Sequence, residues 1–478
     1  MSSFAALLPV LVITLGALLI LLLEAFLHRS RRDYLGFITL AVLFGGAVLV
    51  IRSWGLGMSF FDGLLVLDDF GLFFVLIMLV TTALIVLISM RWISLHNTDF
   101  GEFFALLLFA LAGMMVMLTS SDLVVIFLGL EVLSISSYAL AGLQTGSLPS
   151  SEAAVKYFLL GSFASSFLVF GIALLYGAAH STGIDVIIAF FRTQSSFGPM
   201  ALAGLGFLIV GFGFKIAVVP FHMWTPDVYQ GAPTPVTAFF SIGPKAVGFA
   251  VLLRILAPLW ADSVDPGRVA DVITGLAVLT MVFANLAALR QTNLKRLLAY
   301  SSIAHAGYLL LAVLTGDASG LMFYLTVYLF MNVGAFASLI FLSRREHEYA
   351  ELKNIAGVGF RYPWVGAGFA IFLFSLAGLP PTGGFLAKFT IFAEAVRQGH
   401  LALVILAVLA SLVSVFYYLR VVVFMYMRPS EGEFQIESYH PALFLAFFLC
   451  IYGVLQLGLF PGNVLVFARR AAASLSLF

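Results

Sequence analysis

The lysines of this 478-residue chain are few, and most of them stand within long apolar stretches. Six of the 24 lysine and arginine residues are lysines, and four of these six are Lys156, Lys215, Lys245 and Lys388. Arginine keeps its charge at any physiological pH, whereas an amine in a low-dielectric site can release and take back a proton. These positions therefore predict a proton path through an apolar interior.

A single acidic residue, Glu131 in LGLEVLSISSYAL, stands near the middle of an apolar stretch. A carboxylate at that depth costs roughly 3 kcal/mol or more on insertion scales, so it must face protein or water and needs a partner. We expect Lys156 and Lys215, on the next two helices, to be its partners. A carboxylate that approaches favours the charged lysine, and one that retreats lets desolvation expel the proton. A static salt bridge that only fixes helix packing is the alternative interpretation.

Two further titratable residues stand in the middle of apolar stretches. Lys245 lies in AFFSIGPKAVGFAVLLRIL beside Pro244, which disturbs the helical hydrogen bonds and exposes carbonyl groups. His305 lies in AYSSIAHAGYLLL, and histidine is the side chain that titrates closest to neutral pH. Two interpretations of His305 are open: a hydrogen-bonded core residue, or a member of the proton path.

Helix-breaking residues interrupt two of the apolar stretches, each next to a lysine. In FKIAVVPFHMWTPDVYQGAPTPV, Lys215 is followed by four prolines, and in SLAGLPPTGGFLAKF two prolines and three glycines precede Lys388. Irregular backbone at membrane depth is tolerated only where it is buried in protein or lines a wet cavity. Both breaks therefore predict the position of a transport route.

Four other polar residues are ambiguous. Arg254 and Arg420 stand within a turn or two of predicted helix ends, where we expect them to snorkel as anchors, with Arg420 also a candidate on the exit side. His222 and Asp227 flank the first break. Two roles are open for them: to hydrate the break, or to cap the half-helices on either side of it.

The composition is that of an all-α polytopic membrane protein. Apolar residues make up 62% of the chain and charged residues 10%, against about 25% charged in soluble domains. A helix needs about 20 apolar residues to cross a bilayer, and we count fourteen such windows, of which the seventh and twelfth are interrupted. They are 4–27, 34–52, 70–90, 102–119, 121–143, 153–180, 199–219, 237–258, 269–289, 297–315, 318–342, 363–379, 401–426 and 441–466. Between the second and third windows, Asp62-Gly63 predicts either a short hairpin or an irregular loop.

The two broken helices suggest an internal repeat. Windows four to eight and nine to thirteen form two blocks of five, with the broken helix fourth in each, and an odd number of crossings inverts the second block. Inverted repeats with paired discontinuous helices are typical of transporters. We expect accessory helices in 1–100, the first repeat in 101–260, the second in 265–428, and a loop with the last helix in 429–478.

The loop cations favour an orientation with both termini on the periplasmic side. Six loop cations then lie outside and twelve lie in the cytoplasm, as the positive-inside rule requires. The cytoplasmic twelve are Arg29, Arg31, Arg32, Arg91, Arg290, Lys295, Arg296, Arg344, Arg345, Lys353, Arg361 and Arg428.

The net charge and the cysteine count exclude several other classes of function. The formal net charge of +1 gives no sign of a nucleic-acid surface. The single cysteine, Cys450, cannot form a disulfide, a thiolate cluster for iron–sulfur or zinc, or a CxxCH haem motif. We therefore expect this chain to bind no metal or redox cofactor, and any redox chemistry to be carried out by partners.

Several ordered motifs carry a resemblance to a known family. They are LGLEVLSISSYAL, AAVKYFLLGS, FKIAVVPFHMWTPDVYQGAPTPVTAFFS, NLKRLLAYSSIAHAGY and SLAGLPPTGGFLAKF. Together they resemble the antiporter-like proton-channel subunits of respiratory complex I, most closely the subunit N (subunit 2) family of the bacterial NADH:quinone oxidoreductase. The resemblance implies fourteen transmembrane helices with two inverted five-helix repeats. It implies Glu131 as the pairing carboxylate, Lys156 and Lys215 as its neighbours, Lys245 as the central link and Lys388 as the exit-side residue.

The function that the resemblance implies is proton translocation in the bacterial inner membrane, coupled to redox energy from other subunits. The chain has no dinucleotide fingerprint and no soluble domain, so NADH, FMN, iron–sulfur clusters and quinone are expected to belong to partner subunits. Its partners would be other antiporter-like and small membrane-arm subunits and the lipid bilayer. An Mrp-like cation/proton antiporter subunit is the alternative, but it should offer an oxygen-rich sodium site. A structural scaffold is a third, for which four buried lysines would be needlessly costly.

Overall fold

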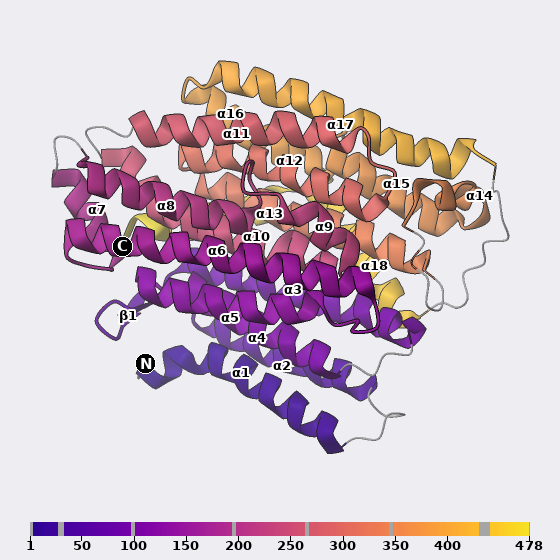
Figure 1. The fold of residues 1–478 in the computed structure, drawn as a ribbon, viewed down its shortest axis with the longest axis horizontal. Helices are drawn as coiled ribbons and strands as arrows, with labels where there is room; N and C mark the ends of the chain where they lie inside the picture. The colour runs from indigo at the N-terminus through magenta and orange to yellow at the C-terminus, as the bar shows by residue number, and fades with distance from the viewer. Residues whose placement is uncertain are drawn as a thin grey trace.

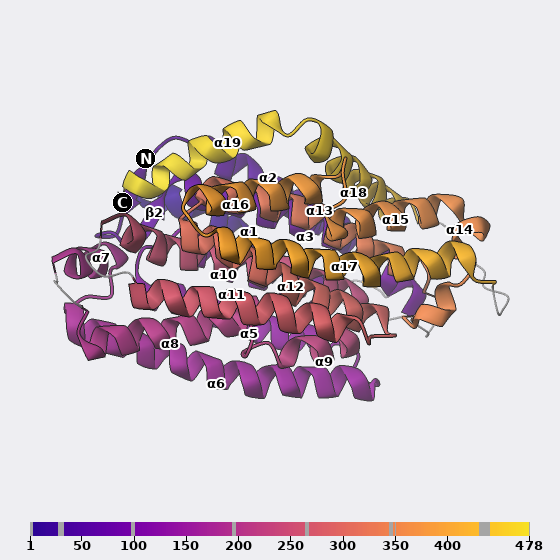
Figure 2. The same cartoon turned by 90° about the horizontal axis from the view of Figure 1, so that it is seen from above.

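The protein, described here by a computed structural model, is a bundle of long helices that run roughly along one axis (Figure 1). The structure describes residues 3–26, 33–96, 101–193, 197–262, 267–343, 348, 350–429 and 440–477. Both ends of the described chain lie at the same end of the bundle in two perpendicular views (Figures 1 and 2). Five arginines used for the orientation prediction lie outside the described residues. They are Arg29, Arg31, Arg32, Arg344 and Arg345.

Thirteen helices among the described residues are long and apolar enough to cross a bilayer. They are α1 Ser3–Phe26, α2 Asp33–Arg52, α3 Asp69–His96, α4 Gly101–Leu118, α5 Leu123–Ala141, α6 Leu148–Ala179, α8 Pro199–Ile216, α10 Thr234–Asp262, α11 Gly267–Ala288, α12 Leu294–Thr315, α13 Ala318–Phe341, α17 Leu401–Met427 and α18 Pro441–Leu459. The predicted twelfth crossing is divided between two shorter helices, α15 Pro363–Ala377 and α16 Gly383–Arg397. The predicted all-α polytopic class is confirmed, whereas the inverted repeat stays a prediction.

Three helices form the centre of the bundle. The most apolar 18-residue window is wholly buried in α10, 94% buried in α12 and 89% buried in α13, against 33% in α1, α2 and α6. Lipid is as apolar as leucine, so burial inside a membrane protein reflects packing and polar contacts more than a hydrophobic drive. Polar residues on the central helices are therefore surrounded by protein rather than lipid.

The two predicted helix breaks are confirmed. Helix α8 ends at Ile216, followed by Ala217 in the left-handed conformation (φ 61), and the chain resumes in α9 Trp224–Gly231. Helix α15 ends at Ala377, with Gly378 at φ 84. Side chains satisfy backbone groups freed at both breaks. The Trp224 indole donates to the Phe214 carbonyl at 3.0 Å, and the Ser375 hydroxyl accepts from the Gly384 amide at 3.1 Å.

The fourteenth window is wrong in extent. The last crossing, α18, ends at Leu459 rather than 466, and α19 Gly462–Ala472 follows it. Pro461 separates the two helices because it has no N–H to continue the helical ladder. The sequence also missed the short elements α7 Ile184–Thr193, α14 Val358–Arg361, η2 Leu352–Ile355 and η3 Ala473–Leu477.

The segment before the third crossing is a hairpin, as one of the two open interpretations predicted. Strand β1 Met58–Phe60 pairs antiparallel with β2 Leu65–Leu67, with Met58 opposite Leu67. Asp62 (φ 54) and Gly63 (φ 94) lie in the connecting turn, in the left-handed region that glycine adopts easily. The hairpin ends directly before α3 and so fixes the start of that helix.

We expect Gly384→Ala to destabilise the second break. A Cβ at this position would lie 1.8 Å from the Ser375 carbonyl oxygen, so the two half-helices would have to move apart. Overpacking of this kind costs about 1–3 kcal/mol or more, and the melting temperature of the detergent-extracted protein should fall. Gly275→Ala in α11 is the control, since its Cβ would meet nothing within 4 Å. Equal melting temperatures for the two variants would contradict this account.

Candidate functional site

Glu131 and Lys215 each bind a different serine. The Glu131 carboxylate on α5 accepts a hydrogen bond from Ser165 on α6 at 2.5 Å, and the Lys215 ammonium on α8 donates to Ser134 at 2.9 Å. Ser134 follows Glu131 by three residues and so lies on the same face of α5. Both serines and Lys215 line a cavity of ≈ 10 Å³, about the room that one water needs. Each charge is therefore held by a neutral hydroxyl, and both serines border the same water-sized cavity.

Lys156 does not take the position expected beside Glu131. Its ammonium lies 2.8 Å from Asp227 on α9 and 2.7 Å from Glu152, and its side chain is 41% exposed. Asp227 also accepts from Arg296 on α12 at 2.6 Å. Asp227 therefore ties the short helix α9 to α6 and α12, a role that neither open interpretation of this residue included. The four-residue spacing of Glu152 and Lys156 could have signalled their pairing on one helix.

His222, the other residue beside the first break, is buried against the ring of Phe283 at a centroid distance of 4.9 Å. Its Nδ1 atom has no hydrogen-bond partner within the part of the chain that the structure describes. The ring is therefore placed by packing as much as by polar contacts.

Lys245 on α10 is buried against α12. Its ammonium donates to the Ser302 hydroxyl at 2.6 Å and to the Ser302 carbonyl at 2.5 Å, and the residue is 1% exposed. Over the described ranges no carboxylate forms an ion pair with this amine. Lys215 lies close by, since a Cβ on Gly248, one turn after Lys245 on α10, would be 3.9 Å from the Lys215 Cβ.

Lys388 occupies the second break. Its ammonium donates to the Leu376 and Ala377 carbonyls at 3.1 and 3.0 Å and to the Ser411 hydroxyl at 2.8 Å. The two carbonyls belong to the C-terminal end of α15, where the helix dipole favours a cation. The ammonium also stands 5.0 Å from the ring centroid of Tyr308 on α12. The break thus provides the oxygen atoms that hold this amine.

His305 lies between these two lysines along α12. Ser302, which binds Lys245, His305 itself, and Tyr308, which lies under Lys388, follow one another at intervals of three residues. Residues three apart lie on one face of a helix, and six residues span roughly 9 Å. Lys245, His305 and Lys388 therefore line up along one face of α12. The ring of His305 is also buried and hydrogen-bonded to Tyr324, so both interpretations of this residue stay open.

The two ambiguous arginines have different surroundings. Arg254, only 6% exposed, forms a bidentate ion pair with Asp68, with N–O distances of 2.8 and 2.9 Å, and also donates to the Leu118 carbonyl at 3.2 Å. The snorkelling prediction is therefore wrong for Arg254, and no local sequence signal pointed to Asp68, 186 residues away. Arg420 is partly exposed and donates to the Leu289 carbonyl at 2.7 Å and to the Gln291 carbonyl just beyond the end of α11, so its role as an anchor stays a prediction.

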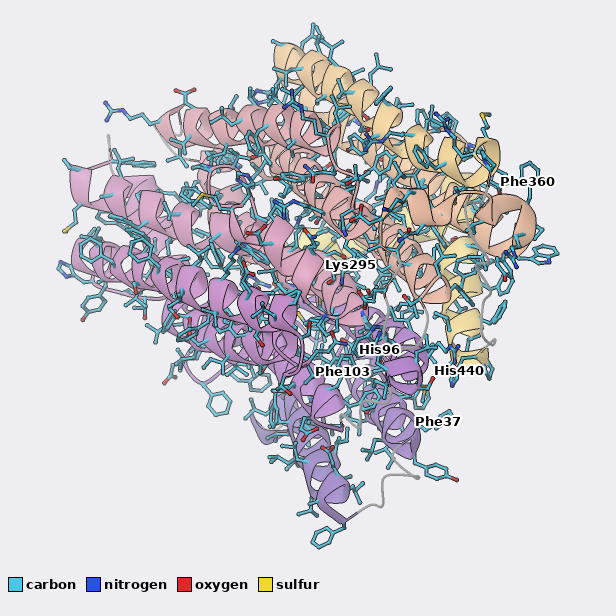
Figure 3. All side chains as sticks on the ribbon, turned by 45° about the vertical axis from the view of Figure 1, so that its right-hand side comes forward. Phe37, His96, Phe103, Lys295, Phe360 and His440 are labelled. Atoms are coloured by element: carbon cyan, nitrogen blue, oxygen red, sulfur yellow. The ribbon has the colours of Figure 1, made fainter. Side chains whose placement is uncertain are left out.

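Lys295, predicted as a loop cation, lies among the packed helices, whereas Phe37 and Phe360 lie at the periphery (Figure 3). Its ammonium binds Glu348 at 2.8 Å and the Ala232 carbonyl at 2.6 Å, and Trp92 donates to the same carboxylate at 2.8 Å. Burial alone would raise the pKa of Glu348, but Lys295 and the hydrogen bonds outweigh it and hold the pKa at about 2. Glu348 stays ionised at physiological pH and fastens this end of the bundle.

Comparisons with known proteins place this arrangement in a family. Residues 120–414 match the family described as NADH:quinone oxidoreductase/Mrp antiporter, TM, a range that includes every candidate residue from Glu131 to Lys388. A NADH-quinone oxidoreductase subunit N of Trichlorobacter lovleyi is 42% identical over 470 residues, which cover 97% of this chain and 96% of that one. This chain belongs to the subunit N family.

Solved structures share the fold over nearly the whole chain. A chain in the structure of respiratory complex I from Thermus thermophilus has a TM-score of 0.83 and 36% identity, covering 96% of this chain and 98% of that one. A chain of the Mrp complex from Dietzia sp. DQ12-45-1b has a TM-score of 0.81 at 21% identity, covering 99% and 98%, and this likeness shows the fold alone. Within the described residues, no three His, Cys, Asp or Glu side chains are grouped so that they could hold a metal ion.

We expect Asp68→Ala to be strongly destabilising. The substitution leaves the buried Arg254 guanidinium without its counter-ion, and breaking such a pair costs about 3–5 kcal/mol. Thermal unfolding of the detergent-extracted protein should show a clear drop in midpoint. Glu394→Ala, which removes the partner of the 74% exposed Arg397, should change the midpoint little, because exposed pairs contribute about 0–1 kcal/mol. If Asp68→Ala and Glu394→Ala have the same unfolding midpoint, the Arg254–Asp68 pair does not stabilise the bundle.

Proposed function

We propose that this chain is a proton-translocating membrane-arm subunit of an NADH:quinone oxidoreductase in a bacterial inner membrane. The observation that carries the proposal is the alignment of Lys245, His305 and Lys388 along α12, with the Glu131–Lys215 pair alongside. Hydroxyls and carbonyls hold the amines of Lys215, Lys245 and Lys388, and among the described residues no carboxylate is in direct contact with them. Neutral oxygens bind an ammonium without locking its proton in place, as a proton carrier requires.

The Glu131–Lys215 pair would act as the switch. Because each charge is bound to a serine rather than to the other charge, a small shift of α5 against α8 changes their separation without breaking a direct ion pair. A closer carboxylate stabilises the charged amine, and a more distant one lets desolvation drive the proton off. Redox energy released in partner subunits would supply the shift, and the released proton would pass towards Lys245 on α10.

Transfer from Lys245 to Lys388 would use His305 and water. The roughly 9 Å from Ser302 to Tyr308 along α12 is too long for one direct step, so water molecules must bridge the groups. Lys388, held at the second break, would release the proton on the periplasmic side. Lys156 would serve at the opposite end, where its partly exposed ammonium and Asp227 connect the path to the cytoplasm.

The remaining expectations follow from this role. We place both termini on the periplasmic side and assign the inverted repeats to 101–260 and 265–428, with a broken crossing in each. The subunit itself would carry no redox centre, and NADH, FMN, iron–sulfur clusters and quinone would be handled by partner subunits. Support for this division of labour comes from the named relatives, which are subunits of NADH-quinone oxidoreductase.

Lys215→Ala should reduce NADH-driven proton pumping in membrane vesicles by roughly tenfold or more, because positioned proton transfer contributes on the order of 10²-fold or more. Coupled quinone reduction should fall with it, while the amount of assembled complex stays the same. Glu131→Ala should behave likewise. Lys353→Ala, at an exposed position outside the bundle, is the matched control and should pump normally. An assembled Lys215→Ala complex that pumps at the control rate would refute the switch.

Purification after mild solubilisation distinguishes this function from that of an Mrp-like antiporter subunit. We expect hydrophilic subunits that contain flavin and iron–sulfur clusters to co-purify with the chain, detected by mass spectrometry and by absorbance of the cofactors. Recovery with antiporter subunits alone, together with sodium-dependent proton exchange in vesicles, would instead support the alternative.

A further inference from the structure

Buried tyrosines surround His305 in the centre of the bundle. The five are Tyr308, Tyr324, Tyr328, Tyr417 and Tyr418, each 1% exposed or less. Phenylalanine would fill nearly the same space with no polar atom to satisfy, whereas every buried hydroxyl needs a hydrogen-bond partner. The hydroxyls therefore point to a role beyond packing.

Two of these hydroxyls face the two ring nitrogens of His305. The Tyr324 hydroxyl on α13 lies 2.7 Å from Nδ1, and the Tyr418 hydroxyl on α17 lies 3.5 Å from Nε2. The Tyr418 hydroxyl also contacts Ser301 on α12, next to the serine that binds Lys245. The imidazole is thus held from both sides by two different helices.

We propose that Tyr324 and Tyr418 are positioning residues that hold His305 with one ring nitrogen accepting and the other donating a hydrogen bond. A neutral imidazole has one acceptor and one N–H donor, and a tyrosine hydroxyl can serve either. With the Tyr324 hydroxyl donating to Nδ1, the proton of the ring is on Nε2 and faces the Tyr418 oxygen. The inference rests on the proposed function, since it concerns the same path.

Passage of a proton through the imidazole ring leaves the number of protons on the ring unchanged. A proton that reaches Nδ1 forms a new N–H bond and makes a transient imidazolium, and the Nε2–H bond then breaks and its proton leaves towards the Tyr418 side. One proton enters, one leaves, and the ring is neutral again in its other tautomer. A turn of the ring, during which both hydrogen bonds open, and rotation of the two hydroxyls restore the first arrangement without moving the proton back. In the opposite direction of transport the same steps run from Nε2 to Nδ1.

A second pair of hydroxyls continues the polar contacts towards Lys388. The Asn285 amide on α11 donates to the Tyr308 hydroxyl at 3.2 Å, and the Asn285 oxygen accepts from Tyr417 at 3.0 Å. These bonds orient the tyrosine whose ring lies under the Lys388 ammonium. Helix α17 therefore contributes Tyr418 near His305 and Tyr417 near the end of the path.

Tyr426 supplies a control on α17. It lies two turns after Tyr418, about 12 Å further along the helix, and its ring packs against that of Phe360 at a centroid distance of 5.8 Å. Tyr328 on α13 does not serve as a control, because its hydroxyl interacts with Ser302, the serine that binds Lys245. Tyr426→Phe and Tyr418→Phe therefore remove the same atom from the same helix, but only the second removes a contact to a ring nitrogen.

The test uses the intact complex in inverted membrane vesicles, with the rates of NADH-driven vesicle acidification and of quinone reduction measured together. Tyr324→Phe and Tyr418→Phe should each lower both rates by roughly fivefold, the factor that loss of one net hydrogen bond corresponds to. The acidification rate in H₂O relative to D₂O should rise in both, because proton transfer then limits the rate, and this readout would not respond to a packing defect. Tyr426→Phe should keep the wild-type rates and isotope ratio, and NADH–ferricyanide activity should show equal assembly.

Wild-type values in both Tyr324→Phe and Tyr418→Phe, with pumping lost in Lys215→Ala, would overturn this inference alone. Equal losses in Tyr418→Phe and Tyr426→Phe with an unchanged isotope ratio would also overturn it, since packing would then explain the tyrosines. Normal pumping in Glu131→Ala and Lys215→Ala would overturn the proposed function as well.

Discussion

The constraint on which the structure depends is that an amine at bilayer depth must find oxygen atoms within the protein. Unbroken helices offer few, because their carbonyls are already bonded. The second break frees the Leu376 and Ala377 carbonyls for Lys388, and Ser302 supplies a hydroxyl and a carbonyl to Lys245. Neutral oxygens satisfy the ammonium but hold its proton less tightly than an adjacent carboxylate would. The same contacts therefore keep the amine in place and leave it able to release its proton.

Direct ion pairs have a different place in the molecule. Arg254–Asp68 and Lys295–Glu348 each join segments far apart in sequence. Breaking a buried pair is costly, so such pairs suit permanent attachments between helices. The chain thus uses buried ion pairs to fasten helices, whereas neutral oxygens bind the amines of Lys215, Lys245 and Lys388, which we propose carry protons.

Features that depend on local sequence were predictable. The crossings follow from apolar length and the two breaks from proline and glycine, and the depth of Glu131, Lys245 and Lys388 follows from position within a window. The partner of Lys156 was not predictable, because Asp227 is 71 residues away and lies on a half-helix whose direction the sequence does not specify. Arg254 was misread for the same reason. The end of α18 could have been predicted from local sequence, because Pro461-Gly462 directly follows it. The window was drawn too long because apolar residues continue beyond this point.

The contrast between broken and continuous helices gives the central path its form. The helices that carry Lys215 and Lys388 are interrupted, and each interruption places an amine at a helix end. Helix α12 is continuous, so Ser302, His305 and Tyr308 keep a fixed three-residue spacing and stay on one face. A movement at one break can change how tightly an amine holds its proton without altering the distances between residues along α12. Charge control at the breaks and proton passage along α12 can therefore occur in one bundle without disturbing each other.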